Sequence, residues 1–122
     1  MNERLTVEVR RERGFVVVAV TGEIDISTVS QLRESLFEQA DNGSDVIVDL
    51  DQISFIDSAG LGALVGASRR AEASGGSLHA VCGQPHTKKL LWLTGVDRRI
   101  PLEESLEQAL SSVASSRDPS AN

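Results

Sequence analysis

The residues best placed to do chemistry in this chain are an aspartate and a serine, Asp57 and Ser58. The apolar run at residues 46–50 predicts a buried strand, and the small residues after position 58 predict a helix that starts there. The N-terminus of a helix has backbone N–H groups without intrahelical partners and the positive end of the helix dipole, so it accommodates an anion. The sequence therefore predicts that the Ser58 hydroxyl can carry a phosphate. Helix capping alone remains the competing interpretation, since serine and aspartate are favoured caps.

Three glycines, Gly60, Gly62 and Gly66, lie in the first turns of this predicted helix. Each costs about 1 kcal/mol relative to alanine in a helix interior. Their sum is large beside the total stability of a small domain, which is about 5–15 kcal/mol. The pattern therefore predicts that another part of a polypeptide comes close to this helix. Tight packing on the protein's own sheet and a docking surface for a partner are both compatible with it.

Composition indicates one compact domain. The chain has 122 residues, 40% of them hydrophobic, and we expect a single domain over residues 1–115 with a flexible tail at 116–122.

The formal net charge of −6 argues against nucleic-acid binding, which needs a basic patch to displace counterions. No run approaches the roughly 20 apolar residues of a membrane span, and the first residues lack the pattern of a secretory signal. We therefore expect a cytoplasmic protein that contacts no membrane.

Hydrophobic periodicity predicts strands that alternate with helices. The expected strands are residues 5–9, 15–20, 46–50 and 78–82, with a short crossing segment at 100–102. The expected helices begin after Ser27 as an N-cap and at Ser58, cover residues 87–93, and follow residue 105. A turn near residue 13 makes the first two strands antiparallel. The predicted fold class is α/β, with a mixed central sheet of four to five strands and about four α-helices.

Four segments of the chain resemble a STAS domain, and they occur in the order found in that family. The segments are residues 22–25, 48–50, 55–62 and 102–110. The similarity covers about residues 5 to 112. Within the family, the chain is similar to single-domain anti-sigma factor antagonists of the SpoIIAA and RsbV kind. The order of four segments is more specific than any one short motif.

This resemblance implies a regulatory switch and no enzymatic activity. Such antagonists bind an anti-sigma factor that is also a serine kinase. This binding displaces a sigma factor from the anti-sigma factor. The kinase phosphorylates the antagonist, and a protein serine phosphatase restores it. By position, Ser58 would be the phosphoacceptor, Asp57 its flanking acid, and Asp25 a loop carboxylate near the docking site. The partner-binding residues implied by the resemblance are Asp25, Asp57, Ser58, Ala59, Gly60, Leu61 and Gly62.

One position departs from the family. Ala59 stands where many relatives have a second hydroxyl, so a second phosphorylation there is excluded. No cofactor and no metal are expected, and the protein is expected to be a monomer or a weak dimer.

Two alternatives remain open. The first is a STAS interaction module in another phosphorylation-controlled pathway. The second is a phosphoaspartate receiver, because Asp49, Asp51 and Asp57 follow a central strand. A receiver needs a metal-binding acidic cluster and a lysine near the acyl phosphate, whereas Lys88 and Lys89 fall in a late helix pattern.

Two further residues carry expectations. Cys82, the single cysteine, lies in an apolar strand pattern and is expected to be a buried structural thiol. Trp92, the single tryptophan, lies in an apolar helix pattern and is expected to anchor the core. An exposed Trp92 would instead indicate a second contact site or a dimer.

Overall fold

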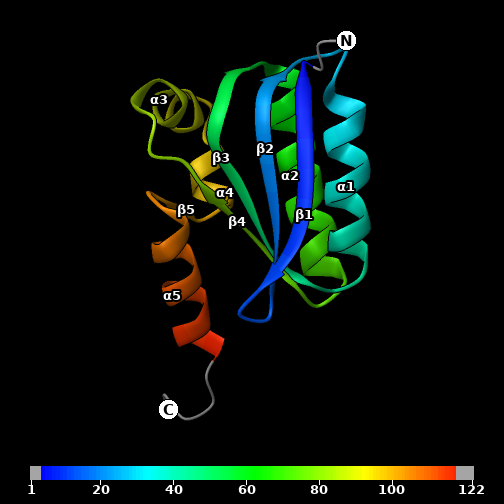
Figure 1. Ribbon diagram of the computed structural model, residues 1–122, viewed down its shortest axis with the longest axis vertical. Coiled ribbons are helices and arrows are strands. Elements are labelled where there is room, and N and C mark those ends of the chain that lie inside the picture. The colour runs from blue at the N-terminus through cyan, green and yellow to red at the C-terminus, as the bar shows by residue number, and fades with distance from the viewer. Residues whose placement is uncertain (1–3, 118–122) are drawn as a thin grey trace.

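Five strands form one sheet, and their order in the sheet follows the sequence (Figure 1). The computed structural model describes residues 4–117. The strands are β1 (Leu5–Glu12), β2 (Phe15–Ile24), β3 (Asp45–Ile56), β4 (Ser77–Val81) and β5 (Leu102–Glu103). β1 pairs with β2 in antiparallel fashion, and every other neighbouring pair is parallel. The predicted mixed sheet is confirmed.

Five helices join or follow these strands. They are α1 (Val29–Asp41), α2 (Ser58–Ala73), α3 (Pro85–Thr94), α4 (Val96–Arg99) and α5 (Leu106–Arg117). A helix lies in each crossover between parallel neighbours, as parallel pairing requires. The α/β class is confirmed, and the helix beyond the four expected is α4, which has four residues.

β2 is covered on both faces, because alternate side chains enter two separate apolar clusters. Val18 lies in the larger cluster with residues of α1 and α2. Val17 lies in a smaller cluster with Leu110 of α5. Figure 1 shows α1 and α2 together on one side of the sheet and α5 apart from them, near β4 and β5. The continuous apolar run in β2 is thus explained by burial from two sides.

β1 is an edge strand and is half-solvated, which agrees with the alternation of apolar and polar residues at positions 5–9. It is joined to β2 by a two-residue turn at Arg13 and Gly14, whose φ angles are 52° and 84°. Positive φ at both positions matches the twist of the two strands, which is why glycine suits the second.

The first helix begins one residue later than predicted. Ser27 as its N-cap is wrong, because Thr28 precedes the first helical residue, Val29. The Ser27 hydroxyl instead donates a hydrogen bond of 2.7 Å to Oδ1 of Asp25. Ser27 therefore organises the loop before α1 and does not cap the helix.

The core position expected for Trp92 is wrong, since its side chain is 65% exposed. α3 buries Thr87 and Leu91 against the domain. Successive helical residues are rotated by about 100°, so the residue after Leu91 points away from the core. Leu93 is 62% exposed for the same reason.

Three remaining expectations concern Cys82, membranes and the C-terminus. Cys82 is buried as predicted, and this burial raises the pKa of its thiol. Within residues 4–117, no helix is both long enough and apolar enough to cross a bilayer. Of the tail expected at 116–122, residues 116 and 117 belong to α5, and residues 118–122 lie outside the described part of the chain.

Candidate functional site

The site expected from the sequence lies where β2 and β3 end side by side. Ile24 and Ile56 are partners in this parallel pair. The backbone N–H of Asp57 donates to the carbonyl oxygen of Ile24 at 3.1 Å. Because parallel strands end at the same sheet edge, the chain after β2 and the chain after β3 emerge together. The structure therefore brings the loop of Asp25 beside the start of α2, which carries Ser58.

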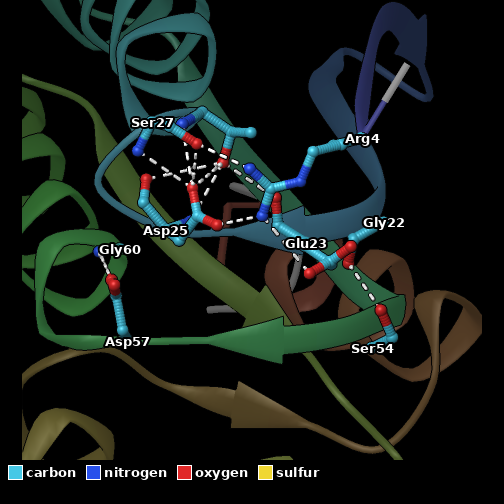
Figure 2. Close-up of polar contacts among 9 residues, drawn as sticks. Arg4, Gly22, Glu23, Asp25, Ser27, Ser54, Asp57 and Gly60 are labelled. Carbon is cyan, nitrogen blue, oxygen red and sulfur yellow. Dashed lines mark hydrogen bonds and ion pairs between the residues drawn. The ribbon is translucent and has the colours of Figure 1, made fainter. Parts of the chain in front are cut away.

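Asp57 is the residue that caps α2. Its backbone is extended, with φ −112° and ψ −171°, and its Oδ1 accepts hydrogen bonds from the backbone N–H groups of Ala59 at 2.9 Å and Gly60 at 3.4 Å. Figure 2 shows the Asp57 side chain directed at the N–H of Gly60. Ser58 is the first helical residue and is exposed. The capping interpretation thus applies to Asp57, and it does not require the Ser58 hydroxyl.

A hydrogen-bond network fixes the carboxylate of Asp25 (Figure 2). Its Oδ1 accepts from the Ser27 N–H at 2.9 Å, the Ser27 hydroxyl at 2.7 Å and the Thr28 N–H at 3.1 Å. Its Oδ2 forms an ion pair with the guanidinium of Arg4. The hydrogen bond from Ser27, reinforced by Arg4, lowers the pKa of Asp25 to about 2. Asp25 is therefore a fixed negative charge at neutral pH, held in an Asx-type turn.

Arg4 is a site residue that the sequence analysis missed. Besides Asp25, its guanidinium donates to the Ser27 hydroxyl at 2.7 Å and pairs with Glu23 at 3.3 Å. The carbonyl oxygen of Arg4 also accepts the Glu23 N–H at 2.9 Å. This contact depends on Gly22, whose φ is +111° and where an added Cβ would overlap the Arg4 carbonyl. The only available signal was that strand pairing places residue 4 close to residue 23.

The three glycines of α2 differ in what surrounds them inside the domain. A Cβ at Gly60 would lie 2.6 Å from Cγ2 of Ile24 and 2.7 Å from Cγ1 of Ile56, so this position serves internal packing. A Cβ at Gly66 would lie 3.2 Å from the ring of Phe37 on α1. Gly62 is exposed, and a Cβ there would have no neighbour within 4 Å. Internal packing therefore explains Gly60 and Gly66, but it does not explain Gly62.

Two exposed apolar side chains flank the site and were also missed. Ile26, next to Asp25 in the loop, is 80% exposed, and Phe55, two residues before Asp57, is 49% exposed. Phe55 pairs with Glu23 across the strands. Strand alternation places its side chain on the opposite face from Ile56, which is buried. Large apolar groups beside fixed charges are typical of protein interfaces.

The carboxylates that suggested a receiver are engaged separately. Oδ1 of Asp49 accepts the Asp51 N–H at 3.0 Å, and Oδ1 of Asp51 accepts the Gly83 N–H at 2.8 Å. Lys88 pairs with Glu104 at 2.6 Å. Among residues 4–117, no group of three or more histidine, cysteine, aspartate or glutamate side chains is arranged to hold a metal ion. The described residues do not supply the acidic cluster that receiver chemistry needs.

Comparison with known proteins decides the family. The STAS domain model matches residues 6–109. The chain belongs to the STAS domain family. This STAS domain is 31% identical over 103 residues to an anti-sigma-B factor antagonist of Bacillus subtilis, covering 84% of this chain and 94% of the relative.

Solved structures of STAS proteins show the same fold. An anti-sigma factor antagonist from Mycobacterium paratuberculosis superposes with a TM-score of 0.83 at 30% identity, over 89% of this chain and 93% of the other. SpoIIAA in its phosphorylated form superposes with a TM-score of 0.68 at 25% identity, over 88% and 99% of the two chains. The resemblance to STAS domains and to anti-sigma factor antagonists is confirmed.

Proposed function

We propose that this STAS protein is an anti-sigma factor antagonist controlled by phosphorylation of Ser58. Its unphosphorylated form binds an anti-sigma factor that has serine kinase activity, and a protein serine phosphatase reverses the modification. The observation that carries the proposal is the exposed Ser58 hydroxyl at the first position of α2, beside a separate cap, Asp57. The relatives named as antagonists and the phosphorylated form of SpoIIAA support it. The protein acts by binding, without catalysis, in the cytoplasm.

The docking surface combines a fixed charge, apolar side chains and an exposed helix backbone. Asp25 supplies the charge, Ile26 and Phe55 supply exposed apolar area, and Gly62 leaves the backbone of α2 open. Leu61 is half-buried and packs against the core while part of it faces outward. Gly60 is buried, so it contributes by keeping α2 close to Ile24 and Ile56, without touching the partner.

Phosphorylation blocks docking through charge and desolvation. A phosphate on Ser58 adds about −1.5 to −2 charge near neutral pH. It would stand beside Asp57, whose Oδ1 accepts two backbone N–H groups, while the start of α2 stabilises the phosphate. A partner that packs over this surface must remove water from the phosphate. A loss of about 3 kcal/mol weakens binding roughly 100-fold, and the domain need not change shape.

The first test combines phosphopeptide mapping with a binding measurement. Protein isolated from its own cells under growth and stress should carry phosphate on Ser58, and Ser58→Ala should carry none. By calorimetry against the anti-sigma factor kinase of the same organism, Ser58→Asp should bind at least tenfold more weakly, with an unchanged circular dichroism spectrum.

Ser111→Asp is the matched control, because it adds the same charge at an exposed position on α5. It should bind like the wild type. Wild-type affinity of Ser58→Asp would refute the electrostatic account. Phosphate on Ser58 combined with no affinity for any anti-sigma factor would favour a STAS module of another phosphorylation-controlled pathway.

A further inference from the structure

α3 presents apolar side chains to solvent and does not carry Ser58. Trp92 and Leu93 are 65% and 62% exposed, and both belong to α3. Large apolar side chains next to each other at the surface are unusual, because their exposure opposes the hydrophobic effect. Tryptophan is also one of the residue types that dominate binding energy at interfaces. This pair therefore requires an explanation that core packing does not provide.

A hollow lies beside these two side chains. It has a volume of about 260 Å³ and is lined by Trp92, Leu93, Asp97 and Arg98. The left-handed conformation of Gly95, with φ +80°, turns the chain from α3 into α4, and Nη2 of Arg98 would lie 2.7 Å from a Cβ at that glycine. The absence of a side chain at position 95 thus lets the guanidinium fold over the turn. The hollow is shaped by this connection between the two helices.

One of the residues that line the hollow, Asp97, has an unpaired acceptor atom. Oδ1 of Asp97 is buried and has no hydrogen-bond partner among the described residues. A buried acceptor without a donor is unfavourable, and a bound group that donates a hydrogen bond to it removes that penalty. The hollow is therefore bordered by apolar side chains and by a residue whose buried acceptor lacks a partner.

The segment that forms the hollow is basic, whereas the protein as a whole is acidic. Residues 85–99 contain four cationic side chains and one carboxylate, in a chain with a net charge of −6. Lys88 pairs with Glu104, whereas Lys89, Arg98 and Arg99 are exposed. An apolar centre with a basic rim is complementary to an apolar segment with acidic flanks.

We propose that the α3–α4 surface, defined as Lys89, Trp92, Leu93, Asp97, Arg98 and Arg99, docks an acidic amphipathic helix of a second protein partner. An apolar side chain of that helix fills the hollow against Trp92 and Leu93. A hydroxyl or amide next to it donates to Asp97, and carboxylates on its flanks meet the cationic rim. The site operates alongside the Ser58 surface and does not depend on phosphorylation.

Charge also distinguishes this occupant from two others. A symmetric dimer through the same surface would place the basic rim of one copy against that of the other, since a two-fold interface uses one patch twice. An anionic membrane would be attracted by the rim but repelled by the net charge of −6. A compact acidic helix satisfies the local charge and leaves the rest of the protein in solvent.

The test uses a displayed library of amphipathic helices with a Leu, Ile and Phe face and a polar face that varies between Glu and Lys. Selection on the wild-type protein, with removal of clones that bind Leu93→Asp, should enrich Glu-rich members. The enriched peptide is then synthesised together with a copy in which Lys replaces each Glu. Because Trp92 is the only tryptophan, its fluorescence reports occupancy directly. The acidic peptide should shift its emission to shorter wavelength and reduce quenching by acrylamide, and the Lys copy should do neither.

Matched variants separate this proposal from the proposed function. Arg98→Glu should weaken the acidic peptide at least tenfold, while Arg33→Glu, the same change at an exposed position on α1, should not. Ser58→Asp should leave peptide affinity unchanged, so failure of the phosphorylation switch and failure of this site give different results.

Three outcomes would overturn the inference. The first is a selection that enriches Lys-rich helices or enriches no helix at all. The second is a shift of Trp92 emission with phosphatidylglycerol vesicles but with no peptide, and the third is a concentration-dependent dimer that Leu93→Asp abolishes.

Discussion

Gly62→Ala separates the two uses of glycine in α2, because it should stabilise the protein and weaken its binding. Gly62 is the fifth residue of α2, is exposed, and has open space where a Cβ would be. Alanine there meets no steric obstacle within the domain. A helical glycine lowers helix stability. Where no contact within the domain requires the glycine, we expect a partner to approach the backbone there.

The size of both effects follows from this geometry. Replacing glycine with alanine in a helix interior should raise the free energy of unfolding by about 1 kcal/mol. For a domain of this size the melting temperature should rise by about 4 °C. At the docking surface, one added methyl group in a close contact costs about 1–3 kcal/mol, so affinity for the anti-sigma factor should fall about tenfold or more.

Urea unfolding followed by circular dichroism gives the stability, and calorimetry with the anti-sigma factor kinase gives the affinity. Ala73→Gly is the control, since it makes the reverse change at the exposed far end of the same helix. It should lower stability and leave affinity intact. A stabilised Gly62→Ala protein with wild-type affinity would refute the docking role of Gly62. A Gly62→Ala protein that is no more stable than the wild type would refute the inference that the space around Gly62 is open.

Three further changes test the site. Gly60→Ala should lower the free energy of unfolding by about 1–2 kcal/mol in urea titrations, because its Cβ would lie 2.6 Å from Ile24; an equal or greater stability than wild type would contradict the packing role. Asp57→Ala should cost about 1 kcal/mol by loss of the cap, whereas Asp57→Asn should retain most of it; equal losses would point to charge instead of capping. Asp25→Asn tests the pH dependence: the folded pKa of about 2 lies below the unfolded value near 4, so the stabilisation by the carboxylate is complete above pH 4 and lost as pH falls towards 2. The difference in unfolding free energy between wild type and Asp25→Asn should shrink across that interval, and a constant difference would exclude the Arg4 and Ser27 network as its source.

Sequence alone determined the features that depend on local pattern. The alternation of strands and helices and the position of Ser58 at a helix start follow from periodicity and from the residue types at element ends. Cys82 was placed correctly because its neighbours in the chain have a strand pattern that only burial explains. The family resemblance rested on segments that are short but ordered along the chain.

Tertiary structure decided everything that depends on which segments meet. Arg4 joins the site because β1 pairs with β2, a contact between residues about twenty positions apart in sequence that no local window contains. Gly60 and Gly62 are two residues apart in one helix, but they lie on different faces of it. Gly60 therefore faces the core, and Gly62 faces open space. In α3, likewise, the angular step between neighbouring residues buries Leu91 and exposes Trp92. An apolar pattern shows that a helix has a buried face, but the direction of that face is set by the sheet and helices on which it packs.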